Sequence, residues 1–85
     1  MPKREKASLN LREYLAKNAN VHELIVVKKS GIIMQTVYVG DDRNFTLDKD
    51  IERNLVSTES WGIFPVLDKD RYLKEIPCRF IELEE

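Results

Sequence analysis

Residues 21–39 read Val-His-Glu-Leu-Ile-Val-Val-Lys-Lys-Ser-Gly-Ile-Ile-Met-Gln-Thr-Val-Tyr-Val, and the rest of the fold is predicted around them. Two runs rich in β-branched residues flank the Ser30-Gly31 pair. Glycine supplies the positive φ that a tight turn requires, so the pattern predicts an antiparallel hairpin with a two-residue loop. The predicted cross-strand pairs are Lys29 with Ile32, Val27 with Met34, and Ile25 with Thr36.

Both faces of this predicted hairpin are apolar. Side chains alternate across a strand, so one face carries Ile25, Val27, Ile32, Met34 and Tyr38, and the other carries Leu24, Val26, Ile33, Val37 and Val39. An antiparallel pair with one face in water shows a cleaner alternation of apolar and polar residues. We therefore expect a central hairpin, with a helix on one face and another layer or another chain on the other.

Residues 8–19 are predicted to form an N-terminal helix that lies across the hairpin. Asn10 and Glu13 have the spacing of a capping box, and Ser8 is the other candidate cap. The apolar residues that share one helical face are Leu11, Tyr14, Leu15 and Ala19.

The second half of the chain is predicted to add a further hairpin. In residues 45–55 the spacing of Leu47, Ile51 and Leu55 favours a short second helix, with a strand at residues 44–47 as the alternative. Residues 61–67 and 72–83 read as two strands, and Pro65 requires an edge strand or a bulge because proline cannot donate to a ladder.

These elements predict an α+β fold. An N-terminal helix packs on a small antiparallel sheet of four or five strands built from two hairpins, and there is no βαβ alternation that would indicate a parallel sheet. Residues 1–7 are expected to form a flexible basic tail, and residues 8–85 a single domain. The sequence holds 85 residues, a length at which the stability margin is small and dimerisation helps.

The residue types needed for catalysis are scarce. The chain has one histidine, His22, and one cysteine, Cys78, which together cannot build a zinc site. No glycine-rich phosphate or dinucleotide motif is present. The acidic turn at Asp41-Asp42 is typical of solvated turn residues. We therefore predict that the protein is not an enzyme and has no metal and no cofactor.

The expected location is the cytoplasm. A single cysteine excludes an internal disulfide. The basic N-terminus is not followed by the apolar segment of a secretory signal. No apolar run approaches the roughly 20 residues that a membrane span needs, so no membrane partner is expected.

Four side chains are the candidate partner-binding residues. Lys28 and Lys29 lie at the predicted hairpin tip, where a basic finger contacts phosphate or discourages edge pairing. Trp61 opens an apolar strand, either as a binding anchor or as a core residue. Arg43 follows the hairpin, and its guanidinium suits a carboxylate or a phosphate.

The predicted function is that of a small non-catalytic protein-binding or regulatory module, with a protein partner or a homodimer. Residues 1–40 carry seven basic and three acidic side chains, whereas residues 41–85 carry seven basic and twelve acidic ones, and such polarity steers a partner. The alternative is a nucleic-acid binder that uses the tail and the hairpin tip, although a pI of about 5.9 stands against it. The lysine content and the lack of motifs suit an accessory protein of a phage or mobile element.

Overall fold

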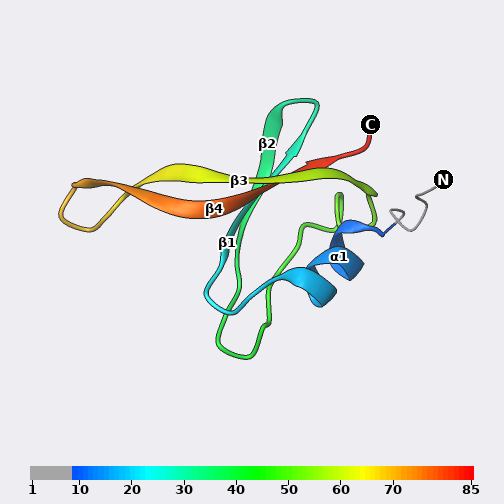
Figure 1. The fold of residues 1–85 in the computed structure, drawn as a ribbon, viewed down its shortest axis with the longest axis horizontal. Coiled ribbons are helices and arrows are strands. Elements are labelled where there is room, and N and C mark those ends of the chain that lie inside the picture. The colour runs from blue at the N-terminus through cyan, green and yellow to red at the C-terminus, as the bar shows by residue number, and fades with distance from the viewer. Residues whose placement is uncertain (1–8) are drawn as a thin grey trace.

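A computed structural model describes residues 9–85 of the protein, and the predicted basic tail at residues 1–7 lies outside them. One helix, α1 (Leu11–Asn18), precedes a four-stranded sheet. The strands are β1 (Leu24–Lys29), β2 (Ile32–Tyr38), β3 (Val56–Leu67) and β4 (Leu73–Leu83), and their order in the sheet is β2-β1-β4-β3 (Figure 1). The α+β class is confirmed.

The sheet is mixed, so the predicted antiparallel sheet built from two hairpins is wrong. Strand β1 pairs antiparallel with β2 on one side and parallel with β4 on the other. The side chains of Ile25, Val26 and Val27 on β1 are all 0% exposed. A run of apolar residues that is buried on both faces is typical of a strand inside a sheet rather than at its edge, and β1 has a hydrogen-bonded neighbour on each side. The expected central hairpin is right for β1 only, because β2 is an edge strand and most of its side chains are exposed. The local pattern also did not give the direction of β4.

The turn between β1 and β2 has the predicted two-residue loop. Ser30 and Gly31 have φ angles of 55° and 78°, and Lys29 pairs with Ile32 across the loop. Two central residues with positive φ define the turn type whose twist matches that of the flanking strands.

Replacing Gly31 by alanine is expected to lower the free energy of unfolding by about 1–2 kcal/mol, because an L-residue is strained at this φ. A Cβ atom at Gly31 would have no heavy atom within 4 Å, so the whole effect is one of backbone strain. Urea unfolding measures it, and Ser30→Gly is the matched control. Ser30→Gly should leave stability unchanged or raise it, and an equal loss for both variants would contradict the strain explanation.

Beyond Lys29 and Ile32 the predicted register is wrong, because β2 contains a bulge. Val27 pairs with Gln35 and Lys28 pairs with Ile33, so Met34 is the extra residue between them. A bulge shifts each following residue to the opposite face of the strand. Val37 therefore lies opposite Ile25 and is buried in the core, instead of on the face away from it.

The helix begins at the predicted capping box, but it does not lie across the first strand pair as predicted. Its first backbone amides, those of Leu11 and Arg12, donate to the carbonyls of Asn54 and Glu52. The helix is thus fastened to the 52–54 segment and reaches the sheet through its side chains. The buried side chains of the helix form one core with side chains of the sheet and of the connection at residues 39–55. This core includes Leu11, Tyr14, Leu15, Ile25, Val27, Val37, Leu47, Ile51, Ile81 and Leu83.

Residues 45–48 are irregular, residues 49–53 form turns, and Leu55 makes an isolated bridge with Asn10, so neither the predicted second helix nor its alternative strand is present. Leu47 and Ile51 still enter the core at the spacing that suggested a helix. The Gln35 side chain fixes the segment to β2 by donating to Thr46 O at 2.9 Å and accepting from Asp48 N at 2.9 Å. Tertiary anchors of this kind override a weak local helical preference.

Strands β3 and β4 extend well beyond the rest of the sheet. Pairing of β4 with β1 begins at Arg79, opposite Ile25, whereas its pairing with β3 continues out to Leu67 and Leu73. Residues 61–78, called the arm below, therefore form a two-stranded ribbon that projects from the body (Figure 1). The molecule measures 49 × 29 × 25 Å, with the arm along its longest dimension.

Candidate interaction surface

One face of the arm is exposed and almost wholly apolar. In the β3–β4 register, Trp61, Ile63, Pro65 and Leu67 share this face with Leu73, Glu75 and Pro77. The exposed fractions of Trp61, Ile63, Leu67 and Leu73 lie between 55% and 65%. Glu75 is its only charged residue. We call this surface the Trp61 face.

The opposite face of the arm is largely covered by the arm's own side chains. It carries Phe64, Val66 and Ile76, all half-buried, and Cys78, which is fully buried. The ring of Phe80 lies over Gly62, where a Cβ atom would come within 2.8 Å of its Cε2 atom. The exposed apolar surface of the arm is therefore on the Trp61 face, while outside the arm β2 also exposes Ile32, Ile33, Met34 and Tyr38.

The base of the arm is fixed by a buried arginine. Arg79 is 5% exposed, and its guanidinium carbon lies 4.6 Å from the ring centroid of Trp61. The Nε atom donates to Glu23 at 2.7 Å, and Nη2 donates to the other oxygen of that carboxylate at 3.3 Å. The Glu23 side chain is itself only 7% exposed, so this ion pair is nearly free of water.

Three further contacts complete the hydrogen bonding of Arg79. Its Nη1 atom donates to Tyr14 Oη at 3.0 Å and lies 3.4 Å from Glu59 Oε1, and its Nη2 atom donates to Asn18 O at 3.3 Å. The arginine thereby links α1, the residue before β1, and the two strands of the arm. A buried charge of this kind is tolerated because its donors are satisfied.

Sequence reasoning missed Arg79, although a signal was present. The residue lies between Cys78 and Phe80 in an apolar strand, at a position that the alternation assigns to the core face. An arginine in such a position needs a buried carboxylate. Glu23 was not identified as its partner because the two residues are far apart in the chain.

The four candidate residues do not come together. Lys28 Nζ lies 5.6 Å from the ring centroid of Phe80. Lys29 lies on the other side of the strand, where Asn54 accepts from its Nζ at 2.9 Å in the amide orientation that satisfies both groups. Arg43 donates to the carbonyls of Ala16 and Ala19 at 3.1 and 3.0 Å and so caps the end of α1. Of the four, only Trp61 lies on the exposed apolar surface.

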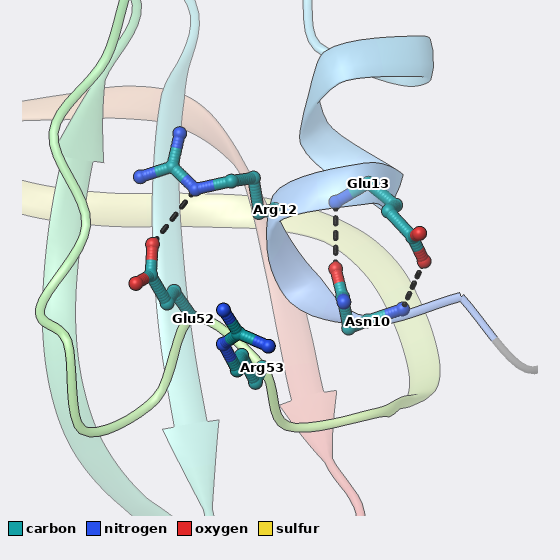
Figure 2. A pocket seen from close by; sticks show the side chains of 5 residues that line it. All are labelled: Asn10, Arg12, Glu13, Glu52 and Arg53. Carbon is teal, nitrogen blue, oxygen red and sulfur yellow. Dashed lines mark hydrogen bonds and ion pairs between the residues drawn. The ribbon is translucent and has the colours of Figure 1, made fainter.

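A hollow of about 320 Å³ lies beside the start of α1 (Figure 2). Asn10 and Glu13 form the capping box within it. Arg12 donates to Glu52 at 2.7 Å, and Arg53 lines the floor beside them. Its two arginines are matched by two glutamates, and the contacts fasten the helix to the 52–54 segment.

Outside this hollow and the contacts of Arg79, the titratable side chains of residues 9–85 lie apart from one another or in exposed pairs such as His22 and Asp41. His22 Nε2 shares a hydrogen bond with Asp41 Oδ1, and the imidazole stacks on Tyr38 with 6.1 Å between ring centroids. Both partners of the hydrogen bond are exposed. Among residues 9–85, no group of three or more histidine, cysteine or acidic side chains is placed to hold a metal ion.

Cys78 is predicted to resist thiol reagents in the folded protein. Its side chain is fully buried, and burial raises the pKa of the thiol above its ordinary value because the thiolate loses solvation. At neutral pH the native protein should react with a maleimide far more slowly than the urea-unfolded chain, with mass spectrometry as the readout. Equal rates in the two states would show that the arm opens freely at Cys78.

No family model, no curated protein and no solved structure matches the chain. In the part of the chain that the structure describes, no helix has the length and apolar character to cross a membrane. The functional assignment therefore rests on the geometry of the arm and its base.

Proposed function

We propose that the protein is a non-catalytic protein-binding module of the cytoplasm, and that the Trp61 face of the arm is its docking surface. The observation that carries the proposal is a projecting two-stranded ribbon whose one uncovered face is apolar. A two-stranded ribbon is marginally stable in water, so a partner that covers this face also stabilises the arm.

The size of the exposed surface supports a protein partner. The large side chains of the Trp61 face expose on the order of 500 Å², which is as large as the biggest apolar patches of ordinary monomers. Such patches mark interaction sites because covering them removes apolar surface from water, which favours association.

Trp61 has the properties of an anchor residue. It is 64% exposed, yet its ring is held against a guanidinium that is itself fixed by hydrogen bonds. A rigid aromatic side chain loses little conformational entropy on binding, and tryptophan and arginine are enriched among residues that dominate binding energy.

Affinity capture from an extract of the source cells tests the proposal. The first bait is the full native chain. The second bait is the double variant Ile63→Lys/Leu73→Lys, which places two charges on the Trp61 face. Ile32→Lys is the matched control because Ile32 is equally exposed on β2, away from the arm. All three baits are treated with nuclease before elution.

We expect the native and Ile32→Lys baits to capture a protein in stoichiometric amount, which can be a further copy of the chain. The double variant should not capture this protein. Equal retention on the double variant, or no protein on any bait, would overturn it. Material that disappears on nuclease treatment would favour the nucleic-acid alternative.

A further inference from the structure

We infer that the occupant of the Trp61 face is a second copy of this chain, bound face to face about a twofold axis with the two arms antiparallel. The inference rests on the proposed function and names the partner. It is carried by the edges of the arm, by the distribution of charge along it, and by the area that two such faces bury.

The edges of the arm do not favour the addition of another strand. At the tip, Asp68 N donates to Tyr72 O at 3.0 Å, and hydrogen-bonded pairs alternate with non-bonded pairs along an antiparallel ladder. Pro65 and Pro77 therefore both fall in non-bonded pairs, in which backbone N–H groups point outward. Each edge thus lacks a donor that an added strand would require, which disfavours strand addition and favours association through the side chains of a face.

The charges of the arm suit contact with an identical arm. Residues 61–78 contain three acidic and three basic side chains, all in the tip and the first part of β4. Two neutral arms meet without net repulsion. In the antiparallel arrangement the tip of one arm, where Asp68 and Asp70 balance Lys69 and Arg71, comes next to the base of the other, where Glu59 lies against Arg79, so no two like-charged clusters meet.

The buried area reaches what a specific contact needs. Two Trp61 faces that cover each other bury about 1,000 Å² of surface, which is the lower limit for a specific interface. A self-complementary contact of this kind covers both arms at once, since a twofold axis places the same patch on both subunits. One copy in contact with a smaller partner would leave part of its face in water.

Sedimentation equilibrium of the purified full chain tests the inference. We expect the native chain and Ile32→Lys to sediment at twice the chain mass of 10.0 kDa at concentrations well above about 1 µM. The Ile63→Lys/Leu73→Lys variant should sediment as a monomer with an unchanged far-ultraviolet circular dichroism spectrum. Trp61 is the only tryptophan, so its emission in the native chain should shift to shorter wavelength as concentration rises.

A native chain that stays monomeric, with Trp61 emission independent of concentration, would overturn self-association. It would leave the Trp61 face for a different protein, which the capture experiment detects separately. A dimer that survives the double variant but is lost in Ile32→Lys would place the interface on β2 and overturn this inference, while the capture experiment would still decide the proposed function.

Discussion

Replacing Arg79 by methionine is expected to lower the free energy of unfolding by about 3–5 kcal/mol, because it leaves the buried Glu23 carboxylate without its charge partner. The substitution also removes the contacts to Tyr14 and Asn18 that join the helix to the sheet. Urea denaturation followed by circular dichroism measures the loss.

Two matched variants separate this explanation from a loss of packing. Arg53→Met removes an exposed arginine and should change the stability by less than about 0.5 kcal/mol. Adding Glu23→Gln to Arg79→Met should restore part of the loss, because the unpaired charge is then absent. The ion-pair explanation would be contradicted if the stability losses of Arg79→Met and Glu23→Gln simply added in the double variant.

Replacing Trp61 by alanine is expected to weaken association by at least about 2 kcal/mol, a roughly 30-fold rise in Kd, because Trp61 is the largest exposed side chain of the Trp61 face. The indole is 64% exposed in the single chain, so the stability of the monomer should fall by less than about 1 kcal/mol. Sedimentation equilibrium gives the first quantity and urea unfolding of the dilute protein gives the second.

Trp61→Phe is the control for this prediction. It keeps an aromatic ring over Arg79 and should weaken association less than the alanine variant does. An alanine variant with native affinity would show that Trp61 is only a cover for the arginine.

Local signals in the sequence predicted the local elements well. The capping box at Asn10 and Glu13 and the two-residue loop at Ser30-Gly31 are both present, because each depends on residues within a few positions of one another. The register of β2 was wrong because both of its faces are apolar, so the alternation does not reveal the extra residue Met34.

The long-range features were not predictable from these patterns. Parallel pairing of β1 with β4 joins distant parts of the chain, and the strand pattern is the same for either direction. The arm exists because β4 continues past its last pair with β1, and no residue type marks that point except Pro77. Trp61 was identified as a candidate, but the Arg79–Glu23 pair that holds it needed the folded structure.

Amide hydrogen exchange of the arm tests the central claim, that the Trp61 face is an interaction surface, most directly. The purified chain is compared at concentrations far below and far above its dissociation constant, with mass spectrometry reporting on residues 61–78. We predict fast exchange toward the tip of the arm when dilute, since an isolated two-stranded ribbon opens readily, and strong protection there when concentrated, with the peptides around the buried residues Cys78 and Ile25 unchanged. The claim would be contradicted if exchange in the arm were equally fast at both concentrations and if no captured protein slowed it.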